Sequence, residues 1–350
     1  MKFQSYNIFW QHMHKAAKNK GFPLRIMFEL TYRCNFNCKH CYIPQNYRNY
    51  NELKTKEVFS ILDQLADIGC FYLGFTGGEP FIREDILDIL WYAKKLGFEI
   101  IIYTNGFFID EGIAQQLALL KLNKVDITIP GINRIAFECI SGVSGSRDKV
   151  FKAIGLLYKK RVNLGFKTCV LKENEKEISQ IQDFAYSLSA LHRLDDMLLP
   201  CLDGSKEPFK YRGALIENSD ASDAQRAAYP IPHASGRALN QSLVNPSANH
   251  RELFKCGVGI TQAAITPLGE LKMCLMIDYP KYKILENSLK DCWQRLKDLV
   301  SNIKLDDNYQ CDKCELMPFC TWCPARGWLY SKNFTFCEPE SRAFAENRCG

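Results

Sequence analysis

Apolar and polar positions follow the pattern of successive β/α units from residue 25 to about residue 200. Short apolar runs alternate with segments whose apolar residues recur every three or four positions, as in a helix that packs one face on a sheet. The predicted strands are 25–30, 71–76, 99–104, 124–129, 163–171 and 195–201. The predicted helices are 55–69, 83–97, about 110–120, 146–160 and 175–190. Strands that are apolar on both faces predict a parallel sheet.

Six such units predict a partial (β/α)6 barrel, related to the TIM barrel, over residues 25–202. In barrels of this kind the loops that follow the strands carry the chemistry. Residues 203–255 lose the apolar periodicity and are rich in Ser, Asn, Gly, Pro and Ala, so we expect a long connecting segment that is either an ordered loop covering the substrate or partly disordered. Residues 256–350 form a cysteine-rich unit, and residues 1–24 precede the barrel as an N-terminal extension.

Composition narrows the function class. Hydrophobic residues make up 47% and charged residues 24% of the chain, the balance of a soluble globular protein. The net charge of +6 is mild and no basic run is interleaved with aromatics, so nothing favours nucleic-acid binding. No apolar stretch approaches the roughly 18 residues of a membrane span, and no secretion signal begins the chain. A cytoplasmic enzyme is expected.

Sixteen cysteines are unusual for such an enzyme. Reducing cytosol disfavours structural disulfides, so many cysteines there favour metal binding. Three lie within 34–41 and seven within 256–337. The other six are scattered and are expected to be mostly small buried hydrophobic residues: Cys70, Cys139, Cys169, Cys201, Cys292 and Cys349.

The first group comprises Cys34, Cys38 and Cys41, which follow the first predicted strand. Three thiolates can hold three irons of a [4Fe–4S] cluster and leave the fourth iron open. The alternative is a zinc site in which His40 is the fourth ligand. The spacing Cys-x3-Cys-x2-Cys resembles the signature loop of the radical S-adenosylmethionine (AdoMet) superfamily. In that family the position of His40 is usually aromatic and lies near the adenine.

The sequence "TGGEP" at 76–80 ends the second predicted strand, as in the same family, where this loop holds the amino group of AdoMet. Gly77 and Gly78 would let the backbone approach the ligand closely. Glu79 would supply an anionic acceptor for the ammonium.

The ends of the third and fourth predicted strands can also be compared with motifs of this family. Thr104 and Asn105, in "YTNG", match a polar pair that commonly faces AdoMet, although an Asn-Gly turn is the simpler alternative. Relatives commonly read Ser-x-Asp-Gly after the fourth strand, where this chain reads "TIPG". Thr128 keeps the hydroxyl, whereas Pro130 removes the carboxylate, so a role of that aspartate is not expected here.

This resemblance implies that the amino and carboxylate groups of AdoMet fill the open iron site. One electron from the reduced cluster then yields methionine and a 5′-deoxyadenosyl radical, while the protein orients and shields the radical.

The C-terminal cysteines are similar in order to the SPASM extension of radical AdoMet enzymes that modify peptides, although the final gap in "CDKCELMPFCTWC" is one residue shorter than usual. Two zinc ribbons are the alternative. The resemblance implies two auxiliary [4Fe–4S] clusters. Their ligands would be Cys256, Cys274 and Cys323 for the first, and Cys311, Cys314, Cys320 and Cys337 for the second.

The first auxiliary set lacks a fourth cysteine, since residues 257–265 contain none. Either Cys201 completes the site or the iron is open to substrate, and openness is slightly favoured. Asp203 and Glu207 are weak candidates for a catalytic base because they follow the sixth predicted strand, and Cys201, the last residue of that strand, is a third weak catalytic candidate.

The function implied is oxidative modification of a residue in a ribosomally made precursor peptide, giving a crosslink, thioether, epimer or oxidised side chain. Expected partners are the precursor, a reductant such as flavodoxin or ferredoxin, and a separate leader-binding protein unless the connecting segment binds the leader. A sulfatase-type protein maturase and an oxidative decarboxylase of a small cofactor precursor are alternatives. A zinc-stapled binding module or an iron–sulfur electron carrier is the alternative from another class.

Overall fold

The fold is built on one nine-stranded sheet. The computed structural model describes residues 6–195, 197–213, 253–307 and 309–349. The strand order is β6-β5-β4-β3-β2-β1-β7-β8-β9. The strands are β1 (Arg25–Thr31), β2 (Tyr72–Gly77), β3 (Glu99–Thr104), β4 (Lys124–Thr128), β5 (Leu164–Cys169), β6 (Leu191–Asp195), β7 (Gln262–Ile265), β8 (Glu270–Lys272) and β9 (Tyr282–Lys283).

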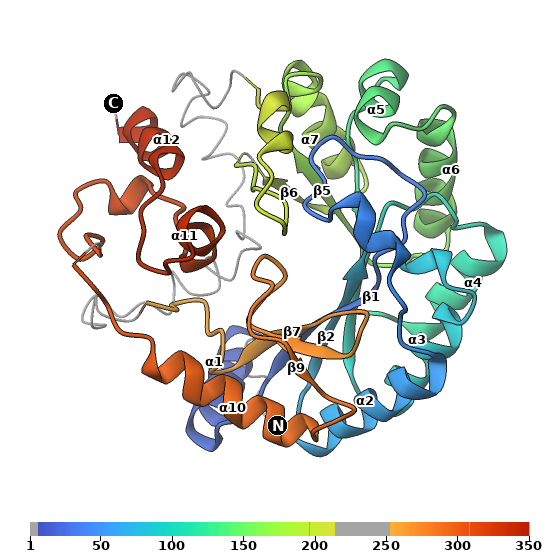
Figure 1. The fold of residues 1–350 in the computed structure, drawn as a ribbon. Coiled ribbons are helices and arrows are strands. Elements are labelled where there is room, and N and C mark those ends of the chain that lie inside the picture. The colour runs from blue at the N-terminus through green and yellow to red at the C-terminus, as the bar shows by residue number, and fades with distance from the viewer. Residues whose placement is uncertain (1–5, 196, 214–252, 308, 350) are drawn as a thin grey trace.

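Strands β1 to β6 pair in parallel with their neighbours in chain order. Helices cover the outer face of this sheet and form an arc around it (Figure 1). They are α2 (Thr55–Asp67), α3 (Ile86–Lys95), α4 (Glu111–Leu120), α5 (Arg134–Ser141), α6 (Ser146–Lys159) and α7 (Ile178–Ser187). The predicted partial (β/α)6 barrel is therefore confirmed.

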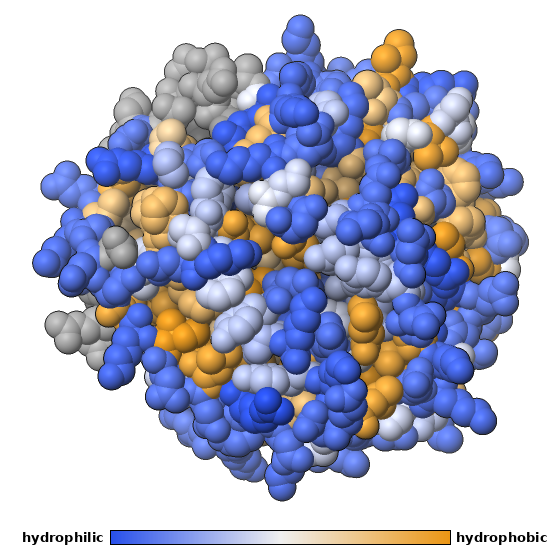
Figure 2. Space-filling view, viewed as in Figure 1, coloured by the Kyte–Doolittle hydropathy of each residue, from blue (hydrophilic) through white to orange (hydrophobic). Residues whose placement is uncertain are grey.

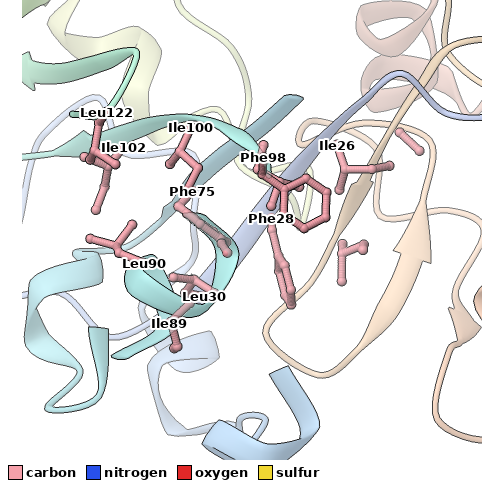
Figure 3. Packing of buried hydrophobic residues seen from close by; sticks show 14 of the residues in the cluster. Ile26, Phe28, Leu30, Phe75, Ile89, Leu90, Phe98, Ile100, Ile102 and Leu122 are labelled. Atoms are coloured by element: carbon pink, nitrogen blue, oxygen red, sulfur yellow. The ribbon is translucent and has the colours of Figure 1, made fainter. Parts of the chain in front are cut away.

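Alternation along the strands separates the apolar face from the polar face. Ile26, Phe28 and Leu30 of β1 are buried against the helices, and the rings of Phe28 and Phe75 lie 6.2 Å apart at their centroids (Figure 3). The intervening positions Met27 and Glu29 face the barrel interior together with their register partners. Because a one-residue slip would exchange the two faces, the hydrophobic packing fixes which polar groups enter the barrel.

The sixth strand was predicted wrongly. We expected it at 195–201, but β6 is Leu191–Asp195. Its sequence "LHRLD" is partly exposed, as an edge strand can be, and so lacks a continuous apolar run. The apolar run that misled the prediction follows the strand, where Leu198 packs with Ile140 and Leu171.

Before residue 200, two helices were not predicted, α1 (Tyr6–Lys20) and α5. The signals for α5 were present, because the Asn133 side chain accepts a hydrogen bond from Ala136 N and Gly142 ends the helix with φ of 71°. In α1, Trp10 packs edge-on against Tyr72 of β2, with ring centroids 4.5 Å apart.

The cysteine-rich unit continues the barrel sheet. Strand β7 pairs in parallel with β1, and β8 and β9 extend the sheet in antiparallel fashion. Helix α10 (Leu289–Asn302) is tied to α2 through a hydrogen bond from Leu289 N to Gln64 Oε1 of 2.8 Å. Helices α11 (Pro324–Ser331) and α12 (Pro339–Cys349) lie on the opposite side of the barrel from α3 and α4 (Figure 1).

Of the connecting segment, residues 214–252 lie outside the described part of the chain, and a short 3-10 turn, η4 (Glu207–Tyr211), precedes them. The face seen in Figure 2 is largely hydrophilic, with hydrophobic side chains in separate patches. In the part of the chain that the structure describes, we find no helix both long enough and apolar enough to span a bilayer.

Candidate functional site

The loop that carries Cys34, Cys38 and Cys41 leaves the carboxyl end of β1. Arg48, from the short 3-10 turn η1 (Gln45–Asn49), donates to the carbonyl oxygens of Cys34 at 3.4 Å and Phe36 at 2.9 Å. On the other side, the loop backbone donates to Ile140 and Ser141 at the end of α5. The loop is thus held at both edges of the barrel mouth.

The three thiols lie close enough to influence one another. Burial raises the pKa of Cys34 to about 11, and the Cys41 thiol adds to the shift. The pKa of Cys38 is raised by burial and then by Cys41 and Cys34. None of them is in a disulfide. In the described residues no His, Cys, Asp or Glu group is arranged around a single metal ion. Three neighbouring thiols that are free of disulfides are a donor set that fits an iron–sulfur cluster.

The glycines after β2 are required by packing against this loop. Gly77 has φ of +127°, and a Cβ there would lie 2.1 Å from the carbonyl oxygen of Thr31. A Cβ on Gly78 would lie 2.2 Å from the carbonyl oxygen of Arg33. The close approach that the structure records is therefore between the "GGE" loop and the start of the cysteine loop, which fixes one against the other.

Glu79 is fully buried and its carboxylate is surrounded by donors. Oε1 accepts hydrogen bonds from Thr104 Oγ1 at 2.6 Å and Phe81 N at 3.1 Å, and Oε2 accepts from Asn105 N at 2.6 Å. The carboxylate therefore joins the ends of β2 and β3 and shapes the loop predicted to receive the AdoMet amino group.

The other predicted cofactor contacts face the same opening. The Asn105 amide donates to Asn35 Oδ1 at 2.9 Å within the cysteine loop. Thr128 ends β4 and is partly exposed. Burial lowers the pKa of His40 to about 4, so the imidazole is neutral at physiological pH, and its buried Nδ1 has no hydrogen-bond partner. A neutral ring with a spare nitrogen is able to contact an adenine.

The buried carboxyl of Glu79 gives a testable pH dependence. Burial raises its pKa from 4.5 to about 7, although hydrogen bonds from Thr104, Asn105 and Phe81 oppose the rise. Between these pH values the folded chain keeps a proton that the unfolded chain has lost, so this contribution to stability is complete below pH 4.5 and is lost as the pH rises through 7. In the wild type, this term should lower the free energy of unfolding by roughly 3 kcal/mol as the pH rises from 4.5 to 7. Glu79→Gln has no titrating carboxyl at this position, so we expect the variant to lack that decrease.

Urea unfolding of the cofactor-free protein at several pH values gives the free energy of unfolding of wild type and variant. The contribution of Glu79 is the difference between their pH dependences. Equal pH slopes for the two proteins would contradict it.

The C-terminal cysteines gather in two groups. Burial raises the pKa of Cys274 to about 12, and the thiols of Cys323 and Cys256 add to the rise. Cys274 follows β8, and Cys323 caps α11.

A separate set surrounds Cys311, whose pKa burial raises to about 12 with further contributions from the thiols of Cys337, Cys320 and Cys314. These influences divide the seven cysteines into a group of three around Cys274 and a group of four around Cys311.

Cys201 lies elsewhere. Its thiol contacts the carbonyl oxygen of Cys41 at 3.5 Å, and the charges that influence it come from Asp203, Cys41 and Glu207. Asp203 is exposed and accepts from Ser205 N, and Glu207 pairs with Lys210 at 2.6 Å in an exposed ion pair. These three weak catalytic candidates are thus beside the cysteine loop at its outer edge.

Because Cys201 lies beside Cys41, we expect Cys201→Ala to retain the full iron content of the enzyme purified without oxygen. The thiol donates to the carbonyl oxygen of Cys41, and the charges that act on it come from Asp203, Cys41 and Glu207, not from the C-terminal cysteines proposed as ligands. Iron and sulfide analysis against wild type checks this. A loss of about four irons would assign Cys201 to a cluster.

The ion pairs within strands β4 and β6 were not predicted. Lys124 and Asp126 of β4 form an ion pair of 2.7 Å, and Arg193 and Asp195 of β6 form another of 3.0 Å. Period-two alternation in "KVDIT" was the signal that could have revealed the first pair.

Comparison with known proteins agrees with this arrangement. The profile of the radical SAM superfamily matches residues 28–185, from β1 into α7. Residues 28–185 are therefore a radical SAM domain. The resemblance inferred from the cysteine loop is confirmed, and such a domain implies one [4Fe–4S] cluster and AdoMet. Cys34, Cys38 and Cys41 would hold that cluster.

Two relatives of this radical SAM enzyme align along most of the chain. The AdoMet-dependent heme synthase of Methanosarcina barkeri is 24% identical over 91% of this chain and 95% of its own length. The antilisterial bacteriocin subtilosin biosynthesis protein AlbA of Bacillus subtilis is 25% identical over 87% of this chain and 68% of its own length.

A third relative aligns in part. The Fe-coproporphyrin III synthase of Methanosarcina barkeri is 28% identical over 60% of this chain, and the chain spans half of its length. Among solved structures, Streptococcus suis SuiB bound to precursor peptide SuiA shares the fold, with a TM-score of 0.70 and 18% identity over 98% of this chain and 82% of that chain.

When the cluster and AdoMet are bound, they supply a 5′-deoxyadenosyl radical for hydrogen abstraction. The polypeptide positions the reaction. Glu79 fixes the ends of β2 and β3, and the neutral imidazole of His40 keeps a buried nitrogen without a hydrogen-bond partner in the cysteine loop.

Proposed function

We propose that this radical SAM enzyme oxidatively modifies a residue of a ribosomally synthesised peptide, forming a crosslink, thioether, epimer or oxidised side chain. The observation that carries the proposal is that the charges acting on Cys274 and Cys311 divide the seven C-terminal cysteines into a group of three and a group of four, in a unit whose strand β7 pairs with β1. Net oxidation of a substrate needs an electron acceptor near the barrel mouth, and these thiols offer ligands for one.

The ligand sets that we propose are those of the sequence analysis, with Cys256, Cys274 and Cys323 around one auxiliary [4Fe–4S] cluster and one of its irons open. Cys311, Cys314, Cys320 and Cys337 would hold the other. The group of three and the group of four support this division. AlbA, a bacteriocin biosynthesis protein, and SuiB, solved with a precursor peptide, support a peptide substrate.

We also propose a cytoplasmic setting with three kinds of partner, namely the precursor peptide, a flavodoxin or ferredoxin as reductant, and possible leader recognition by a separate protein. Low-potential reduction is required by the chemistry of the family, and small iron–sulfur or flavin proteins supply it.

A second candidate is oxidation of a small cofactor precursor. It is favoured by the heme synthase of Methanosarcina barkeri, which aligns over 91% of this chain.

Two measurements test the proposal. Protein purified without oxygen should contain about twelve irons per chain. The reduced enzyme should then be incubated with AdoMet and either peptides encoded beside its gene or Fe-coproporphyrin III. Mass spectrometry of a peptide that loses hydrogen in step with 5′-deoxyadenosine formation would support the first candidate. Turnover of the porphyrin alone would replace it by the second.

A further inference from the structure

Two cations stand side by side on the inner face of the sheet at the barrel mouth. Strand register pairs Thr128 of β4 with Lys167 of β5, and Lys167 with Arg193 of β6. Residues paired in this way point to the same face of a sheet and lie at the same level. Lys167 and Arg193 therefore lie in one row across the sheet with Thr128, a proposed cofactor contact at the end of β4.

Both cations have unused hydrogen-bond donors. The Lys167 ammonium forms no ion pair or hydrogen bond with any residue that the structure describes. Arg193 uses Nη2 to bind Asp195, while its buried Nε has no partner. The nearest other carboxylate of the interior, Asp126, is already paired with Lys124. An Arg fork beside a free ammonium is a geometry suited to a planar carboxylate.

The pair lies near the reaction centre. The charge of Lys167 acts on His40, Cys41 and Cys169, which places the ammonium beside the cysteine loop. All the proposed AdoMet contacts come from the loops after β1 to β4, whereas this pair comes from β5 and β6. This pair is therefore not among the proposed AdoMet contacts.

We propose that Lys167 and Arg193 bind a carboxylate group of the substrate at the barrel mouth. This inference rests on the proposed function, because it requires that a substrate enter the mouth where AdoMet is cleaved. The carboxylate identifies a substrate class, namely an acidic residue or carboxyl terminus of a peptide, or a propionate of a cofactor precursor. The shared chemistry could also come from the methionine carboxylate of AdoMet, and the experiment separates these sources.

The test measures acetylation of Lys167 by an N-hydroxysuccinimide ester, using the cluster-loaded enzyme and peptide mass spectrometry. Propionate and propionamide are the probes, because they have nearly the same size and differ in charge. Propionate at about ten times its Kd should slow acetylation of Lys167 about tenfold. Propionamide should have no effect, and the exposed Lys283 serves as the internal reference in every digest.

A variant pair tests the second cation. Arg193→Met should increase the propionate concentration needed for protection about tenfold, since one charged hydrogen-bonding partner is lost. Arg193→Lys retains the charge and should keep most of the protection. Both variants leave Lys167 in place as the measured residue.

Repeating the assay with AdoMet bound assigns the source. Protection by propionate that persists beside AdoMet supports a substrate carboxylate. Full protection by AdoMet, none by decarboxylated AdoMet and no further effect of propionate would assign the pair to the cofactor and overturn the proposal. Equal effects of propionate and propionamide would also overturn it. Formation of 5′-deoxyadenosine in the same samples reports separately on whether the radical chemistry itself fails.

Discussion

The variant Cys34→Ala/Cys38→Ala/Cys41→Ala is expected to form no 5′-deoxyadenosine from AdoMet and to keep about eight of about twelve irons. The three thiols lie together in one loop at the barrel mouth. The C-terminal cysteines influence one another in separate groups, so their iron should be independent of this loop. Chromatography of the nucleoside products and iron analysis of the same preparation measure both effects.

A control for cysteine removal is Cys70→Ala/Cys292→Ala. Both residues are buried, and their thiols contact only backbone carbonyl oxygens among the recorded hydrogen bonds of the described residues. This control should lose some stability through small cavities and retain its nucleoside product. Wild-type amounts of 5′-deoxyadenosine from the triple variant would refute the assignment of the loop to the radical cluster.

The barrel was predictable because most of its strands carry apolar residues on both faces, which makes each strand a nearly continuous apolar run in the sequence. Runs such as "EIIIYT" and "FYLGFT" contain enough apolar residues to be recognised without tertiary information. The edge strand β6 was displaced in the prediction because "LHRLD" receives its stability from pairing with β5. Strands β8 and β9, with three and two residues, are too short for a periodic signal and depend on β7 for their position.

For the candidate site, sequence spacing was informative where function requires residues close in the chain. Cys34, Cys38 and Cys41 could be grouped on that ground. It could not reveal that Glu79 is enclosed by Thr104 and Asn105, because this depends on two strands ending at the same level. Sequence spacing also could not place Lys167 beside Arg193, because they become neighbours only through the register in which β5 pairs with β6.

The ion pair between Glu29 and Lys272 connects the barrel with the cysteine-rich unit. Glu29 of β1 and Lys272 of β8 are both fully buried, with Oε2 and Nζ 2.9 Å apart. Tyr42, which follows Cys41, donates to Glu29 at 2.9 Å. Lys272 also lies two residues before Cys274. One buried carboxylate therefore links the radical-cluster loop, the first strand and a proposed auxiliary-cluster ligand.

Lys272→Met should lower the free energy of unfolding by about 3–5 kcal/mol, because the Glu29 carboxylate would be left buried without its counter-charge. Denaturant unfolding monitored by circular dichroism measures the loss. We also expect the variant to release iron from both the barrel loop and the C-terminal unit sooner on heating, since Tyr42 and Cys274 adjoin the pair.

The matched control is Lys283→Met on the neighbouring strand β9. Lys283 pairs with Glu286 at a similar separation of 2.7 Å, but both side chains are more than half exposed, at 59% and 63%. Removing such a surface pair should cost less than about 1 kcal/mol. The double variant Glu29→Gln/Lys272→Met removes both charges and should recover much of the stability lost in Lys272→Met, because no unpaired charge remains inside. If Lys272→Met is no less stable than Lys283→Met, the buried pair does not hold the two parts of the chain together, and the continuous sheet from β1 through β7 to β8 must do so alone.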